Sequence, residues 1–167
     1  MENRYKVVMC DMDDTLIKTA SGNTFPIGIW DMALKTEVFD KIKQLSPEYV
    51  FIVTNQGGVG KFVSEQSIDV KTRYVAQCMR DYIGCETDFL VCTSDDKSCP
   101  DRKPNIGMGI AMLKKHSLLN LLDGCGKQEV LMVGDASGKP GDFSDSDKKF
   151  AENMHIEYID VDDLVSM

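Results

Sequence analysis

The sequence lacks any long apolar run, and this absence sets the first limit on the class of protein. No segment approaches the roughly 20 consecutive apolar residues that a membrane-spanning helix needs. The start of the chain is polar and shows none of the apolar stretch of a signal peptide. We therefore expect a protein without membrane contact that resides in the cytoplasm, or in the nucleus if its source is eukaryotic.

Closely spaced cysteine pairs are also missing. The six cysteines are scattered without a Cys-x-x-Cys pair, which indicates free thiols in a reducing compartment rather than a disulfide framework. Cys92 and Cys99 lie near each other in the sequence, but neither His116 nor His155 is close enough to complete a tetrahedral zinc site. The sequence therefore does not predict a structural zinc. The cysteines are Cys10, Cys78, Cys85, Cys92, Cys99 and Cys125.

Positive charge is scarce. The 19 Lys and Arg residues are outnumbered by 27 Asp and Glu residues, which gives a net charge of −8. Since phosphate neutralisation by Lys and Arg supplies most non-specific affinity for nucleic acid, this balance argues against a protein that wraps a duplex. It does not exclude a protein that grips a single phosphorylated end.

What the chain does contain is an alternation of short apolar runs with segments of helical period. This alternation predicts βα units and a parallel sheet in an α/β protein of one domain, residues 1–167. The stretch 17–33 after the first strand predicts a two-stranded flap, with a simple connection to the first helix as the alternative. The expected strands are 5–10, 48–53, 87–92, 129–133 and 156–159, and the expected helices are 34–45, 65–83, 105–117 and 146–154, with a last turn at 161–166.

Asp11 and Asp13 close the first apolar run. A buried strand would place both carboxyl groups in the crevice beyond its carboxyl end, where open α/β sheets bind ligands. Two carboxylates this close repel each other unless a cation neutralises them or one stays protonated. A carboxylate nucleophile beside a carboxylic acid can take up a phosphoryl group and protonate its leaving oxygen. The pair alone would equally suit a solvated acidic turn.

Three further strand ends carry polar clusters, and a parallel sheet would bring all four to one edge. Thr54, Asn55 and Gln56 follow the second strand, where a hydroxyl and backbone amides can hold phosphate oxygens. Lys103, at an expected helix start, can neutralise charge on a transferring phosphoryl group. Asp135 follows the fourth strand. The repeated polarity at four strand ends favours a functional site over four solvated loops.

The order of four short motifs resembles that of the haloacid dehalogenase superfamily of phosphotransferases. The motifs read DMDDTL from Asp11, VTNQ from Val53, RKP from Arg102 and VGDASGKP from Val133. Within this superfamily the chain is similar, over nearly its whole length, to the phosphatase domain of the polynucleotide kinase 3′-phosphatase type, a DNA 3′-phosphatase. The resemblance implies a Rossmann-like three-layer sandwich with a mostly parallel central sheet and no cap domain.

The resemblance also implies roles for the residues at matching positions. Asp11 would be the nucleophile that forms an aspartyl-phosphate, and Asp13 would protonate the leaving oxygen. Lys103 would balance the charge of the phosphate. Asp11, the backbone carbonyl of Asp13 and Asp135 would hold Mg²⁺, which prefers hard oxygen ligands. Asp147 would orient Lys103 or a metal-bound water.

Neighbouring polar residues would bind the substrate. The resemblance implies that Thr54 and the backbone amide of Asn55 hold the phosphate, with Thr15, Gln56 and Arg102 as further substrate-binding residues. The implied partner is a 3′-phosphorylated nucleic-acid end, DNA rather than RNA. Such an enzyme would act in end repair beside a separate kinase or ligase.

Two features depart from the resemblance or limit it. Asp14 stands where Gly is common, but Asp tolerates a positive φ better than most side chains, so we expect only a slight change of geometry. The segment between Gln56 and Arg102 has room for one helix and one strand with loops, not for a cap domain. The expected site is therefore open and can admit the end of a polymer.

Two other functions stay open at this point. The first is a small-molecule phosphatase related to histidinol-phosphate or heptose-bisphosphate phosphatases, against which the open site counts. The second is a non-catalytic phosphate-binding module, which would require that Asp11 or Asp135 be displaced from the site. Oligomeric state does not follow from the sequence.

Overall fold

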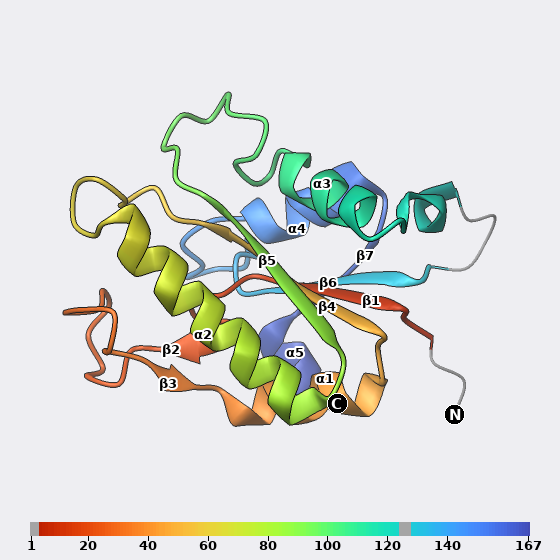
Figure 1. Ribbon diagram of the computed structural model, residues 1–167, viewed down its shortest axis with the longest axis horizontal. Coiled ribbons are helices and arrows are strands. Elements are labelled where there is room, and N and C mark those ends of the chain that lie inside the picture. Colours follow the sequence, from red (N-terminus) through yellow and green to blue (C-terminus); the bar gives the residue numbers. More distant parts are fainter. Residues whose placement is uncertain (1–3, 124–127) are drawn as a thin grey trace.

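Five parallel strands form the central sheet of the computed structural model (Figure 1). The structure describes residues 4–123 and 128–167, so the expected free thiol of Cys125 and the polar residues 1–3 lie outside the description. The strand order is β5-β4-β1-β6-β7, and each pairing in this sheet is parallel. The predicted parallel sheet is therefore confirmed. The strands are β1 Val7–Cys10, β4 Tyr49–Asn55, β5 Glu86–Cys92, β6 Val130–Gly134 and β7 Glu157–Asp160.

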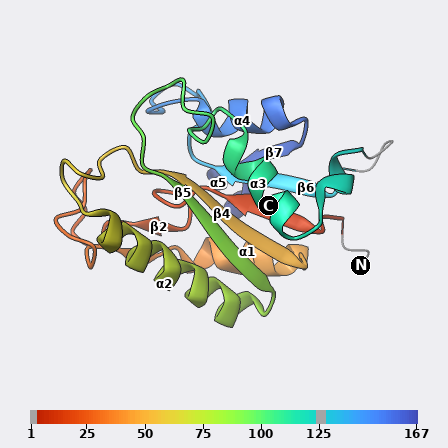
Figure 2. The ribbon, with the colours of Figure 1, turned by 45° about the horizontal axis from the view of Figure 1, so that its top comes forward.

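Helices cover both faces of the sheet (Figures 1 and 2). α1, α2 and α5 pack on one face around a core that includes Val38 and Ile68, and α3 and α4 pack on the other around Met112 and Phe150. Because both faces are covered, residues of the central strands β1, β4 and β6 are buried whichever way they point, which explains the continuous apolar runs of these three strands. The expected three-layer sandwich is confirmed. The helices are α1 Thr36–Leu45, α2 Glu65–Ile83, α3 Gly107–Lys115, α4 Ser146–Met154 and α5 Val161–Ser166.

Local signals set the two ends of α2. The Ser64 hydroxyl accepts a hydrogen bond from the backbone amide of Ser67 at 3.1 Å and so caps the first turn. Gly84 follows the last turn with a φ of 80°, a left-handed conformation that suits glycine. Since α2 follows the loop after β4, its first turns lie beside the carboxyl edge of the sheet.

The segment after β1 forms the expected two-stranded flap. β2 (Ile17–Lys18) pairs antiparallel with β3 (Ala33–Leu34), so the alternative of a simple connection does not hold. The buried Asp31 carboxylate accepts hydrogen bonds from the backbone amides of Ser21 at 2.7 Å and Ile27 at 3.0 Å. The flap is thus braced from within, and it lies at the same end of the molecule as the loop between β4 and α2 (Figure 1).

The start of α3 differs from the prediction. The helix was expected from residue 105 and begins at Gly107, because the Asn105 side chain donates hydrogen bonds to two carbonyl groups of the preceding loop 97–99, at 3.1 and 2.8 Å. The expectation that Lys103 lies at a helix start is therefore wrong, since it lies in the loop before α3. A short 3₁₀ helix at Leu119–Asp123 was not predicted.

The connection between β4 and β5 consists of α2 and its flanking loops. All of its residues are among those that the structure describes, and they contain no inserted cap domain. No cap domain is therefore inserted between β4 and β5, as expected.

The cysteines that the structure describes are free thiols, namely Cys10, Cys78, Cys85, Cys92 and Cys99. Among the helices of the described residues, none is long and apolar enough to cross a membrane.

Candidate active site

The site lies where the strand order changes direction. The chain goes from β1 to β4 on one side and later to β6 on the other side of β1, so the carboxyl end of β1 faces a crevice between two outgoing connections. Asp11 follows β1 directly, and its backbone amide continues the sheet by donating to the carbonyl of Val133 at 3.1 Å. The sequence places its first aspartate there because the apolar strand ends at Cys10.

Three carboxyl groups gather in this crevice. One oxygen each from Asp11, Asp135 and Asp147 lies within 4.8 Å of the other two. Burial raises the pKa of the Asp11 carboxyl well above its ordinary value, and the charge of Asp147 raises it further. Burial likewise raises the pKa of Asp135. A cluster of this kind favours the binding of cations, which lower the cost of holding several anions together.

Lys103 supplies one cation from the protein itself. Its ammonium group lies 2.9 Å from Oδ1 of Asp11 and 2.7 Å from Oδ1 of Asp147, and its side chain is 1% exposed. Burial alone would lower the pKa of Lys103, but the two carboxylates reverse this effect and raise it, so the side chain stays charged. Of the two partners expected for Asp147, Lys103 or a metal-bound water, the structure shows the contact with Lys103.

Asn55 braces the peptide unit of Lys103. Its side-chain oxygen accepts a hydrogen bond from the backbone amide of Lys103 at 2.9 Å, and its amide nitrogen donates to the carbonyl of the same residue at 3.0 Å. The sequence predicts a role for the backbone amide of Asn55 alone, so this contact of its side chain is additional. No local pattern signals it, since 48 residues separate the partners.

Asp13 lies beside the cluster and is held by other residues. Nε2 of Gln56 donates to Oδ2 of Asp13 at 2.7 Å and to the Thr54 hydroxyl oxygen at 2.9 Å. The ammonium group of Lys71, on α2, lies 3.7 Å from Oδ1 of Asp13. Lys71 is not among the predicted site residues, although its position carries a signal: it falls three residues after Ile68 and four before Val75, in the apolar stripe of α2.

The residues after Asp13 turn sharply into the flap. Asp14 has a φ of 61°, so this position requires the left-handed conformation, which Asp tolerates better than most side chains. Thr15 is fully buried, and its hydroxyl donates to Oδ1 of Asp135 at 3.2 Å. The structure therefore places Thr15 against a carboxylate of the cluster.

The loop after β6 is folded around Asp147. Its Oδ2 accepts a hydrogen bond from the backbone amide of Ala136 at 3.1 Å, and a Cβ atom at Gly134 would overlap the carboxyl group. Asp142 accepts hydrogen bonds from the backbone amides of Ser137 at 3.2 Å and of Lys139 at 3.0 Å. Asp142 therefore shapes the loop, and Asp147 reaches the cluster.

The Arg102 side chain points to the loop after β5. Its guanidinium donates to the carbonyl of Ser94 at 3.0 Å, beside Gly57 in the loop after β4. The structure thus brings most of the predicted site residues into two adjacent groups and leaves Arg102 at their border. The first group contains Asp11, Thr15, Asn55, Lys103, Asp135 and Asp147, and the second contains Asp13, Thr54 and Gln56. Asn55 lies between Thr54 and Gln56 in the chain and so joins the two groups into one network through the backbone.

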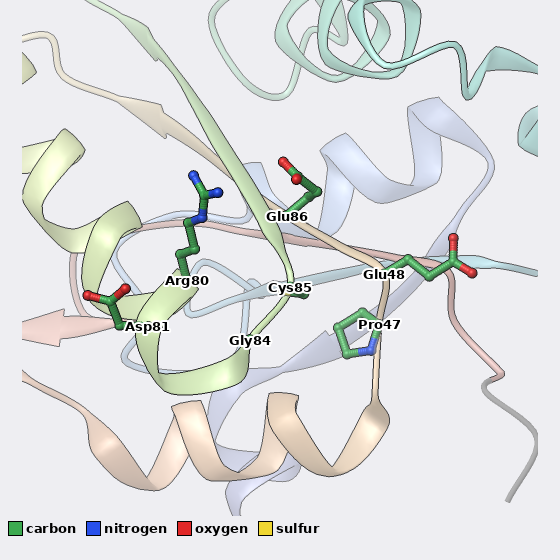
Figure 3. A pocket seen from close by; sticks show the side chains of 7 residues that line it. All are labelled: Pro47, Glu48, Arg80, Asp81, Gly84, Cys85 and Glu86. Atoms are coloured by element: carbon green, nitrogen blue, oxygen red, sulfur yellow. The ribbon is translucent and has the colours of Figure 1, made fainter.

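A depression of about 640 Å³ lies elsewhere, at the amino-terminal ends of β4 and β5 (Figure 3). Its wall carries Glu48, Arg80, Asp81 and Glu86, which belong to neither the acidic cluster nor its network. The candidate active site is therefore a rim of residues at the opposite edge of the sheet and not this depression.

Solved structures share this fold. A HAD-like phosphatase from Mesorhizobium loti superimposes with a TM-score of 0.67 at 19% identity, over 97% of this chain and 85% of that one. D,D-heptose 1,7-bisphosphate phosphatase from B. bronchiseptica, solved with magnesium and phosphate, superimposes with a TM-score of 0.65 at 16% identity, over 92% and 78%. The fold is thus that of the haloacid dehalogenase-like phosphatases.

The sequence comparisons give the family. The model of the polynucleotide kinase 3 phosphatase family matches residues 6–163, and the chain belongs to this family of phosphoric monoester hydrolases. A bifunctional polynucleotide phosphatase/kinase of Schizosaccharomyces pombe is 32% identical over 92% of this chain, which spans only 36% of that protein. An uncharacterized 20.8 kDa protein of Autographa californica nuclear polyhedrosis virus is 26% identical, over 98% of this chain and 87% of its own length.

Proposed function

We propose that the protein is a Mg²⁺-dependent polynucleotide 3′-phosphatase, with residues 1–167 as one catalytic domain and 3′-phosphorylated DNA ends as its substrate in end repair. The observation that carries the proposal is the contact between Asp11 and Lys103 within the acidic cluster, in a chain of this family. The contact combines a carboxylate nucleophile with a cation placed to balance phosphate charge. A separate kinase or ligase would complete the repair of the end.

The proposed chemistry has two steps at Asp11. An oxygen of its carboxylate attacks phosphorus, the bond from phosphorus to the 3′-oxygen breaks, and Asp13 gives its proton to that leaving oxygen. Water then attacks the phosphorus of the aspartyl-phosphate, and Asp13 takes one proton from this water. The bond between phosphorus and the Asp11 oxygen breaks, which releases phosphate and regenerates the Asp11 carboxylate. Lys103, fixed by Asp147 and Asn55, stays beside the transferring group in both steps.

The donor atoms of the site fit Mg²⁺. Carboxylates are the hard oxygen ligands that this cation prefers, and three of them converge here. In the proposal Asp11, the backbone carbonyl of Asp13 and Asp135 hold the ion, and Thr15 orients Asp135. Asp147 keeps Lys103 in place, because both of its oxygens already accept hydrogen bonds. Mg²⁺ bound there would offset the negative charge of the carboxylates and of the phosphate.

In the proposal Thr54 binds the phosphate. Its hydroxyl oxygen accepts a hydrogen bond from Gln56, which leaves the hydroxyl proton free to donate to a phosphate oxygen. In the proposal the backbone amide of Asn55 is a second donor to the phosphate. Gln56 holds Asp13, which faces the leaving nucleoside, and contributes to substrate binding in this way. Arg102, at the border of the network, contacts the substrate further from the phosphorus.

The open edge of the sheet supports a polymer substrate. Without a cap domain over the site, selectivity has to come from the flap and the loops around it, and these segments carry Lys18, Lys61 and Lys139. Lysines in these segments suit the phosphates that flank a terminal one. A small metabolite offers no flanking phosphates of this kind.

Steady-state kinetics on matched substrates test the proposal. We expect kcat/KM for a 3′-phosphorylated DNA oligonucleotide to exceed that for a 3′-mononucleotide by about 100-fold or more, because remote contacts can be used at the reacting centre. The same panel includes the RNA oligonucleotide and several phosphosugars. A phosphosugar or the mononucleotide turned over as well as the DNA oligonucleotide would replace the proposal with a small-molecule phosphatase.

A further inference from the structure

Lys71 is a buried cation that the proposed chemistry does not use. Its side chain is 5% exposed and lies on the inner face of α2, where Ile68 and Val75 flank it. A lysine in this position costs stability unless its ammonium group finds an anionic partner. Because its neighbours on α2 are apolar, Lys71 needs an anionic partner from another element.

The partner is Asp13. The Lys71 ammonium lies 3.7 Å from Oδ1 of Asp13, while Gln56 donates to Oδ2 at 2.7 Å. The two oxygens of this carboxyl group thus face two side chains from different elements, α2 and the end of β4. The Asp13 side chain is 47% exposed, so little else restricts its rotamer on the solvent side.

We propose that Lys71 is a positioning residue which, together with Gln56, holds the Asp13 carboxyl group toward the leaving oxygen of the substrate. The inference rests on the proposed function, in which Asp13 transfers the proton to that oxygen. Proton transfer requires the two heavy atoms to approach within about 2.6–3.2 Å. A carboxyl group free to rotate would meet this requirement only part of the time.

The leaving group provides a readout that a merely structural lysine would not change. An alkoxide leaving group needs a proton as its bond to phosphorus breaks, whereas 4-nitrophenolate leaves readily without one. Loss of the Asp13 orientation should therefore slow phosphoryl transfer from an alkyl ester and spare transfer from 4-nitrophenyl phosphate. The ratio kcat/KM reports this first transfer to Asp11.

The test compares Lys71→Met, Lys71→Arg and Arg73→Met in the full chain. Met keeps the apolar stem of Lys71, and Arg keeps its charge. Arg73, an exposed residue of the same helix paired with Asp69, is the matched control. We expect Lys71→Met to lower kcat/KM for the 3′-phosphorylated oligonucleotide by about 10- to 100-fold, and for 4-nitrophenyl phosphate by less than about 3-fold. Lys71→Arg should restore most of the loss, and Arg73→Met should resemble the wild type.

A double-mutant cycle with Asp13→Asn gives a second measurement. If Lys71 acts through Asp13, adding Lys71→Met to Asp13→Asn lowers kcat/KM for the oligonucleotide by no more than about 2-fold. The inference would be overturned if the loss of kcat/KM in the double variant were the product of the losses in the two single variants. It would also be overturned if Lys71→Met lowered kcat/KM equally for both leaving groups while the melting temperature stayed unchanged. The wild-type activity on the oligonucleotide is measured in the same series, so failure of the proposed function is seen separately.

Discussion

The Lys103 ammonium lies 2.9 Å from the Asp11 carboxylate, although 92 residues separate them in the chain. The contact joins the end of β1 to the loop before α3, and the ammonium also contacts Asp147 at 2.7 Å. Both partners of Lys103 are carboxylates, so its charge is retained in a buried place. The nucleophile proposed for this enzyme is thus held beside a fixed cation before any substrate arrives.

The first prediction concerns Asp11. Asp11→Asn should lower turnover of a 3′-phosphorylated oligonucleotide by at least about 10³-fold, because an amide oxygen cannot form the aspartyl-phosphate. Initial rates on purified protein measure the loss, and a thermal melt shows that the variant is folded. Turnover near the wild-type rate, with deamidation excluded by mass spectrometry, would contradict the proposed nucleophile.

The second prediction concerns the metal. EDTA should abolish activity and Mg²⁺ should restore it, with Zn²⁺ a poor substitute, because the converging ligands are hard oxygens. Asp135→Asn should raise the Mg²⁺ concentration needed for half-maximal activity by about 10-fold or more. Titration calorimetry with Mg²⁺ alone checks binding without turnover. An enzyme that stays fully active after metal removal would refute the metal assignment.

Much of the fold followed from the sequence for a simple reason. Strands buried on both faces read as continuous apolar runs, and the run Val50 to Val53 is one example, so the number of strands and their parallel direction could be inferred. The order of the strands in the sheet was not predicted. The start of α3 was placed two residues too early because the Asn105 side chain closes the loop before it. Such a side-chain contact has no periodic signature.

The site was predictable where its residues sit at strand ends, and less so elsewhere. Asp11 and Asp135 end neighbouring strands, so the topology of the sheet alone brings them together. Lys71 lies on a helix, in the stripe that contains Ile68 and Val75. Such a stripe is interpreted as core, so its pattern does not indicate that Lys71 reaches the site. The bracing role of Asn55 depends on a loop geometry that only the folded chain shows.

The third prediction concerns Asp14, whose φ is 61°. Asp14→Gly should change the free energy of unfolding by less than about 1 kcal/mol, because glycine adopts this conformation readily while its unfolded chain is more flexible. Asp14→Val should lower the free energy of unfolding by roughly 1–3 kcal/mol, since a β-branched residue is strained there. Urea denaturation measures both. Equal stability of the Val and Gly variants would show that the conformation is not strained.

The fourth prediction concerns the pH dependence of stability at Asp160. Burial raises the pKa of this carboxyl, but hydrogen bonds from Ser137, the Asp162 amide and Lys139 outweigh burial and lower it overall. The folded protein therefore binds fewer protons here than the unfolded chain. The stabilisation is complete above the unfolded pKa of about 3.9 and is lost as the pH falls through the lower folded value.

Asp160→Asn should accordingly lower the free energy of unfolding by roughly 1–2 kcal/mol at pH 7, with a difference from the wild type that shrinks below about pH 4. Chemical denaturation at a series of pH values measures this difference. The exposed Asp163 of α5, the helix that begins directly after Asp160, is the control, and Asp163→Asn should stay within about 0.5 kcal/mol of the wild type. If the difference in the free energy of unfolding between the wild type and Asp160→Asn grew toward low pH, the pKa of Asp160 would be raised in the folded protein and not lowered.

The last prediction concerns the lysines of the open edge. Lys18 is exposed on β2 of the flap, and Lys61 is exposed in the loop after β4, where it pairs with Asp95 at 2.7 Å. An exposed pair of this kind contributes at most about 1 kcal/mol, so Lys61 can exchange Asp95 for a phosphate of the substrate. Both lysines would then bind phosphates that flank the terminal one.

Replacing Lys18 and Lys61 together with Ala should raise KM for the oligonucleotide by about 10-fold and leave hydrolysis of 4-nitrophenyl phosphate unchanged, because the chemistry does not use them. The slope of log KM against log salt concentration should fall by about 1.4, since each phosphate contact with a single strand releases about 0.7 counterion. Lys6 and Lys43, at the other end of the sheet, form a control that removes the same charge. If the control raised KM equally, the effect would come from net charge and not from contacts at the open edge.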